Sequence, residues 1–97
     1  EHRATRSIAV PYARLAAALA GCYRHALALA RDQGLSSIAF PAISTGIYGF
    51  PPERAAAIAV ATVGDFLAAN PTIERVVFAC FDAATAALYR RALAGVG

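Results

Sequence analysis

Two short apolar segments constrain the fold of this chain more than any other feature. Residues 36–42 (SSIAFPA) and 75–81 (RVVFACF) are apolar on both faces, which is typical of strands inside a sheet that helices cover on both sides. A helical stretch at about 52–69 separates them, so the three form a β-α-β unit with a right-handed crossover. The sequence therefore predicts an α/β fold with two parallel interior strands.

Two further helical stretches complete an α-β-α-β-α order. The first runs from about 13 to 33 and ends at Gly34, a typical C-cap, and the third runs from about 83 to 94 after Asp82, which can cap it. The first helix carries an apolar stripe at helical spacing. Its members are Leu15, Leu19, Cys22, Ala26 and Leu29.

The predicted unit contains too few strands to pair both edges of its two interior strands. Two interior strands need neighbours on their outer edges, and helices cannot supply them. The chain contains no methionine, so we expect it to be trimmed, processed or a piece of a longer protein. We interpret residues 1–12, interrupted by Pro11, as an arm or remodelled N-terminus. Residues 13–97 are then a partial α/β unit that takes more strands by self-association or from a complementing segment.

Composition excludes several classes of protein. The chain is 59% hydrophobic and 15% charged, too apolar for a disordered segment. No apolar run approaches the roughly 20 residues of a membrane span, and no signal peptide is visible. The nine basic residues, all arginine, are scattered and give a net charge of only +3, which argues against a nucleic-acid surface. We expect a cytoplasmic protein without a membrane partner, in which Cys22 and Cys80 are reduced thiols.

The segment from Ile43 to Phe50 is the best candidate for a binding site. It leaves the carboxyl end of the first strand, and Phe81 leaves the second, so both emerge at one edge of a parallel sheet. Gly46 and Gly49 allow a ligand to approach the backbone closely. With the N-terminus of the next helix, such a loop is typical of a phosphate site. Alternatively, the glycines only turn the chain between strand and helix.

Other kinds of site fit poorly. A Walker A loop needs a lysine, which the chain lacks, and the dinucleotide fingerprint needs a third glycine. Ser44 is not flanked by glycines, as the serine of a nucleophile elbow would be. Cys22 and His25 share a helix face, but two ligands do not make a metal site. We therefore predict no metal and no cofactor.

At residues 37–51 the sequence SIAFPAISTGIYGFP closely resembles the second ligand loop of macrodomains, of the type with ADP-ribose hydrolase and O-acetyl-ADP-ribose deacetylase members. The resemblance extends to Cys22-Tyr23-Arg24, to residues 77–82 and to Leu88-Tyr89-Arg90. Residues 15–94 thus look like the C-terminal half of the three-layer macrodomain fold.

This resemblance implies ADP-ribose as the ligand. Phe81 would stack against the adenine, and Tyr48 and Phe50 would border the distal ribose. The backbone that would wrap the diphosphate belongs to Ser44, Thr45, Gly46, Ile47 and Tyr48, with Gly49 in the same loop. Alternatively, Phe81 packs in the core and Tyr48 bonds to its own backbone. No catalytic residue is assigned, and Tyr48 is the one candidate.

The sequence also departs from the macrodomain pattern. The family's asparagine-rich segment, its glycine-rich loop with an acidic residue and its adenine-reading aspartate have no match; Asn70 is the only asparagine. Three hypotheses follow. The intact parent hydrolyses ADP-ribosyl linkages or deacetylates O-acetyl-ADP-ribose, the protein reads ADP-ribose or an ADP-ribosylated protein without turnover, or a truncated fragment has only an association role.

Overall fold

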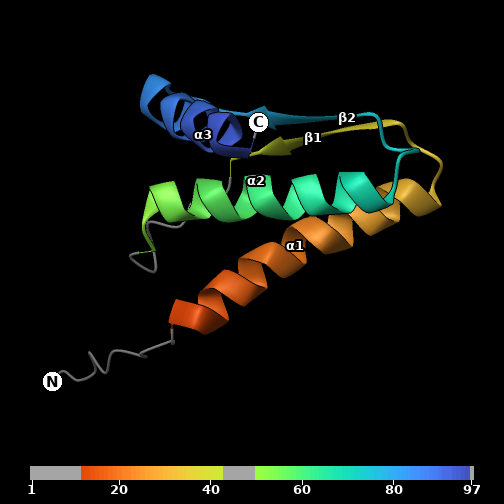
Figure 1. The fold of residues 1–97 in the computed structure, drawn as a ribbon, viewed down its shortest axis with the longest axis horizontal. Helices are drawn as coiled ribbons and strands as arrows, with labels where there is room; N and C mark the ends of the chain where they lie inside the picture. The colour runs from red at the N-terminus through yellow and green to blue at the C-terminus, as the bar shows by residue number, and fades with distance from the viewer. Residues whose placement is uncertain (1–11, 43–49, 97) are drawn as a thin grey trace, which may run out of the picture.

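The described part of the computed structural model comprises residues 12–42 and 50–96. Its elements are α1 (Tyr12–Asp32), β1 (Ser37–Pro41), α2 (Pro52–Ala69), β2 (Arg75–Ala79) and α3 (Ala83–Val96) (Figure 1). The predicted α-β-α-β-α order is confirmed. The interpretation of residues 1–12 as an arm or remodelled N-terminus lies outside the described residues except at Tyr12, where α1 begins.

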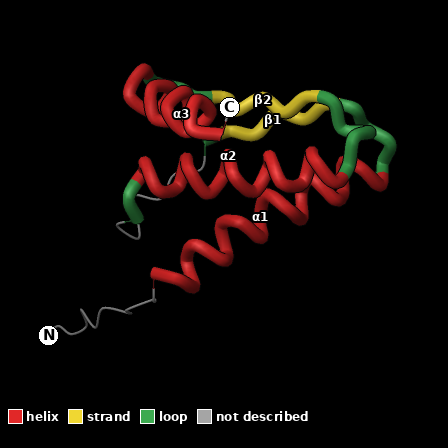
Figure 2. The backbone as a smooth tube through the Cα atoms, viewed as in Figure 1, coloured by secondary structure: helices red, strands yellow, loops and turns green. Residues whose placement is uncertain are grey.

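The two strands pair in parallel, as predicted. They lie side by side (Figure 2). Ser37 lies opposite Arg75, and the register continues to Pro41 opposite Ala79. Beyond the last pair, the backbone N–H of Ala42 donates to the carbonyl of Ala79 at 2.9 Å. Because peptide groups alternate sides along a strand, the nitrogen of Pro41 faces the outer edge of β1, where no described strand needs a donor.

The two faces of this sheet differ in burial. Ile38, Phe40, Val76 and Phe78 belong to the core or pack against it. Residues of the opposite face, among them Ala39 and Val77, are exposed. Among the described residues, helices therefore cover one face of the sheet, whereas the sequence predicted strands covered on both.

The core is built from aromatic rings and small side chains. The ring of Tyr23 meets that of Phe40 edge-on at a centroid distance of 5.0 Å, and Phe78 lies 5.0 Å from Tyr89. These contacts join α1, the sheet and α3 on one face. Three alanines of α2 are buried, which lets the backbone of α2 approach its neighbours closely; they are Ala55, Ala56 and Ala59.

The predicted apolar stripe of α1 is partly wrong. Cys22 and Leu29 are exposed, the latter by 58%. The buried line instead contains Leu19, Tyr23, Leu27 and Ala30. Both lines have helical spacing and share Leu19, so periodicity could not separate them. The aromatic partners on the strands select the line that contains Tyr23.

The helix ends follow the predicted capping chemistry. Gly34 has φ +75°, and the N–H groups of Gly34 and Leu35 donate to the carbonyls of Arg31 and Ala30 at 3.0 Å each. This pair of bonds is a Schellman motif. At α3, the backbone N–H of Thr85 donates to Oδ1 of Asp82 at 2.7 Å, so Asp82 is the N-cap.

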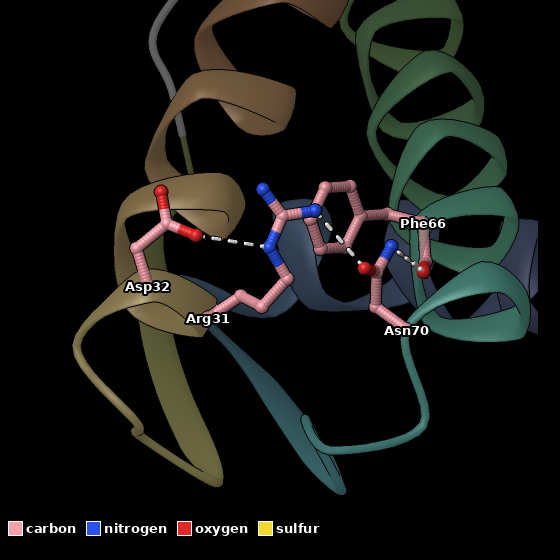
Figure 3. Close-up of polar contacts among 4 residues, drawn as sticks. All are labelled: Arg31, Asp32, Phe66 and Asn70. Atoms are coloured by element: carbon pink, nitrogen blue, oxygen red, sulfur yellow. Dashed lines mark hydrogen bonds and ion pairs between the residues drawn. The ribbon is translucent and has the colours of Figure 1, made fainter.

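Arg31 joins the C-terminal ends of α1 and α2 (Figure 3). One guanidinium nitrogen donates to Oδ1 of Asn70 at 3.0 Å, and the guanidinium carbon lies 5.5 Å from the centroid of the Phe66 ring. Asn70 in turn donates to the carbonyl of Phe66 at 2.9 Å. A second guanidinium nitrogen contacts Asp32 at 3.1 Å. The contacts fix the end of the unit where both strands begin.

Within the described residues, the helices are too short or too polar to cross a bilayer. Cys22 is exposed and Cys80 is half-buried, and both are free thiols.

Candidate functional site

The site predicted from the sequence lies at the carboxyl edge of the sheet. Pro41 and Ala79 end the paired strands opposite each other, so the segments that follow both strands leave from the same edge. The starts of α2 and α3 lie at this end as well (Figure 1). The expected convergence of residues 43–50 and Phe81 on one edge agrees with this topology.

Most residues of the predicted diphosphate loop lie outside the described residues. They are Ser44, Thr45, Gly46, Ile47, Tyr48 and Gly49. Their assignment to the diphosphate, the candidacy of Tyr48 for catalysis and the alternative roles of Tyr48 and the glycines all stay predictions.

Phe50, the last residue of the predicted loop, packs in the core. Its side chain is only 4% exposed and belongs to the same cluster as the buried residues of α2. Pro51 follows in extended conformation and accepts backbone hydrogen bonds from Arg54 and Ala55 at 3.1 and 3.0 Å. Phe50 therefore anchors the start of α2. Its predicted place beside the distal ribose stays a prediction, and a ring this buried offers a ligand little surface.

Phe81 has the opposite environment. Its side chain is 84% exposed, although it lies between half-buried Cys80 and the helix cap Asp82. The alternative that Phe81 packs in the core is therefore wrong for this structure. An exposed aromatic ring at the binding edge of a parallel sheet can stack on a flat ligand, and stacking on adenine stays its predicted role.

At this edge the N-terminus of α2 favours negative charge, while Asp82 is a carboxylate committed to the cap of α3. The N-terminus of α2 faces the edge and has no side-chain hydrogen bond at its cap, so its dipole favours negative charge there. Hydrogen bonds from Thr85 hold the pKa of Asp82 below its usual value, which keeps this carboxylate ionised and bound to α3. Across the described ranges, no group of three or more His, Cys, Asp or Glu could hold a metal ion.

Sequence reasoning named Tyr23 and Tyr89 only within segments that resemble macrodomains and gave neither of them a role. Tyr23 is 1% exposed and Tyr89 is 6% exposed, and both rings contact Phe78 of β2. Among the described residues, no group meets the geometry of a hydrogen bond to the Tyr23 hydroxyl, although burial and then the neighbouring Tyr89 raise its pKa. The spacing of four residues from Leu19 to Tyr23 and from Tyr23 to Leu27 could have indicated that Tyr23 is buried. The predicted stripe ran through Cys22 instead and left Tyr23 out.

Comparison with known proteins extends this description. Residues 6–59, more than half of the chain, match the Macro domain family. An O-acetyl-ADP-ribose deacetylase of Klebsiella pneumoniae is 58% identical over 76 residues, which is 78% of this chain and 43% of that protein. The chain thus spans less than half the length of this relative.

Solved structures agree with the sequence match. The macrodomain of Oceanobacillus iheyensis with ADP superposes with a TM-score of 0.77 at 42% identity, over 84% of this chain and 42% of that one. A variant of the same macrodomain with ADPR superposes with a TM-score of 0.76, also at 42% identity, over 84% of this chain and 43% of that one.

Proposed function

This chain belongs to the Macro domain family, and from that premise we propose that it binds ADP-ribose at the carboxyl edge of its sheet. One observation carries the proposal. The two described residues of the predicted site have complementary environments: Phe50 is buried in the core at the start of α2, and Phe81 is 84% exposed where the chain leaves the same edge of the sheet after β2. Such an edge holds a loop in place and leaves one aromatic surface for a base.

The finer assignments belong to this proposal. Residues 44–48 wrap the diphosphate, mainly through backbone N–H groups, and Tyr48 borders the distal ribose. An ADP-ribosylated protein is the proposed macromolecular partner. Self-association or a complementing segment supplies further strands, and the proposed location is the cytoplasm.

Calorimetry with ADP-ribose tests the binding proposal. We expect saturable heat with the wild-type chain and none with Gly46→Val, because the added side chain blocks close approach to the backbone. Gly64→Val is the matched control, since Gly64 is an exposed position of α2 and an added Cβ there would meet nothing within 4 Å. Absence of heat from the wild-type chain at high micromolar ligand would refute the proposal for this chain.

A second candidate function is hydrolysis of an ADP-ribose derivative by the intact domain. The 58% identity to the Klebsiella pneumoniae deacetylase favours it. The test incubates the chain with O-acetyl-ADP-ribose, alone and together with the N-terminal portion of a macrodomain. Deacetylation in the mixture supports an enzyme. If ADP-ribose binds but the mixture forms no product, a non-catalytic reader is the better description.

A further inference from the structure

A groove between α2 and α3 begins where the predicted ligand loop ends. Its volume is about 420 Å³. Apolar residues from both helices line it, namely Pro51, Ala57, Leu88 and Ala92. Pro51 directly follows Phe50, so the groove opens beside the last residue of the loop. A polymer attached to a ligand in that loop could therefore continue into the groove without crossing another element.

The charged residues of the groove give it a net positive character. Arg54 of α2 and Arg91 of α3 line it together with a single carboxylate, Glu53. Both arginines are exposed, and α3 contains no acidic residue. Two guanidinium groups against one carboxylate favour an occupant with acidic side chains, through charge complementarity that adds specificity and speeds association.

We propose that this groove binds the acidic polypeptide segment next to the modified residue of an ADP-ribosylated protein. The inference rests on the proposed function, because the modified residue is delivered to the groove by the ADP-ribose held in the loop. The apolar lining of Ala57, Leu88 and Ala92 accepts a small apolar side chain of the segment, while Arg91 faces its carboxylates.

A polypeptide fits this groove better than a nucleic acid. A phosphate chain carries a negative charge on every unit, whereas a polypeptide can place an uncharged residue beside Glu53. Stacking platforms are also typical of sites for single-stranded nucleic acids, and none of the described residues that line the groove is aromatic.

The experiment compares two ADP-ribosylated peptides that share the modified residue and differ in their flanks, acidic or neutral. The readout is the ratio of the dissociation constants of the two peptides. The dissociation constant of free ADP-ribose is measured in the same experiment as a reference. For the wild-type chain we expect the acidic peptide to bind roughly 3- to 10-fold tighter at low salt, as exposed charge pairs allow. Arg91→Glu should bring this ratio to one or below. Arg91→Lys should keep most of it.

Arg75→Glu is the matched control. Arg75 is exposed and lies at the opposite end of β2 from the groove, so the same change in net charge should leave the preference for acidic flanks intact. Far-ultraviolet circular dichroism of each variant verifies that it is folded.

The outcomes separate the two proposals. If free ADP-ribose binds but both peptides bind equally, or if Arg75→Glu lowers the preference as much as Arg91→Glu, the groove assignment is wrong and the ADP-ribose site stands. If a single-stranded oligonucleotide displaces the acidic peptide at equal charge, the groove does not select polypeptides, and the assignment is wrong. If ADP-ribose itself does not bind, the proposed function fails and the groove assignment fails with it.

Discussion

Phe50 and Phe81 show how one residue type takes two roles at a single edge. Both belong to the predicted binding edge, but Phe50 is 4% exposed and Phe81 is 84% exposed. Burying an aromatic ring stabilises the fold by roughly 2–3 kcal/mol. Leaving one in water forgoes that gain, so Phe81 contributes little to the stability of this structure and is free to contact a ligand.

Phe81→Ala should therefore separate binding from stability. We expect the free energy of unfolding to change by less than about 0.5 kcal/mol, as for most exposed positions. The dissociation constant for ADP-ribose should rise roughly 10-fold, because stacking between a base and an aromatic ring contributes about 1–3 kcal/mol. Calorimetry and urea unfolding measure the two quantities. Phe81→Tyr keeps the ring and should bind normally. Unchanged affinity of Phe81→Ala would refute the adenine assignment.

The Tyr23 hydroxyl predicts an unusual dependence of stability on pH. Burial, followed by the neighbouring Tyr89, raises the pKa of Tyr23 above its ordinary value. The folded chain thus keeps this proton to a higher pH than the unfolded chain. The protonated Tyr23 hydroxyl therefore makes its full contribution to the free energy of unfolding below about pH 10. Above that pH the free energy of unfolding falls by up to about 1.4 kcal/mol per pH unit. No lysine titrates in this range, since the chain has none.

Tyr23→Phe tests this expectation. The variant should be as stable as the wild type at pH 7, or more stable by about 1 kcal/mol, because it removes a buried hydroxyl that has no well-formed hydrogen bond among the described residues. Above pH 10 it should lose stability less steeply than the wild type. Urea unfolding at pH 7, 9, 10 and 11 measures both effects. If the free energy of unfolding falls equally with pH in the two proteins, the Tyr23 hydroxyl is not buried in the way proposed.

At the scale of elements, the sequence predicted the order and approximate bounds of every described helix and strand. Capping and turn residues explain this success, since Gly34 and Asp82 act locally. The face that α1 buries was partly mispredicted, because Leu15 and Leu19 are shared by two helical stripes. Only the rings of Phe40 and Phe78, distant in sequence, decide between Cys22 and Tyr23. A single sequence does not reveal such a pairing.

Arg31 should stabilise the junction of α1 and α2 more than its exposed position suggests. Its side chain is 40% exposed, and it combines a hydrogen bond to Asn70 with a cation–π contact to Phe66. We expect Arg31→Ala to lower the free energy of unfolding by roughly 1 kcal/mol. Arg31→Lys should restore less than half, because an ammonium lacks the planar fork.

Asp32→Ala is the control for this junction. The Arg31–Asp32 pair joins neighbouring residues, and the Asp32 side chain is 62% exposed. Such pairs contribute less than about 0.5 kcal/mol. Urea unfolding measures the free energy of unfolding of the three variants. If Asp32→Ala lowers it as much as Arg31→Ala does, the stability comes from the ion pair instead.

At the scale of the whole molecule, the chain exposes a sheet face that its sequence predicts to be buried. Ala39 and Val77 lie on this face, and neither outer edge of the sheet has a described partner strand. The solved relatives are more than twice as long as the portion aligned here. Sequence patterning predicts further strands, because apolar residues occupy both faces. It could not identify their source, since the covering residues are not within residues 12–42 or 50–96.

The exposed sheet face and edges should make the isolated chain self-associate. Open strand edges beside an apolar face are a template for pairing with another chain. We expect the mass measured by light scattering to rise with concentration in the micromolar range.

Val77→Lys places a charge on this face, where Val77 is 38% exposed, and should shift the chain toward monomer without loss of helix. Ala68→Lys, on the exposed side of α2, adds the same charge elsewhere and should associate like the wild type. A wild-type monomer at every concentration, with sharp cooperative unfolding, would mean that the two-stranded sheet needs no further partner.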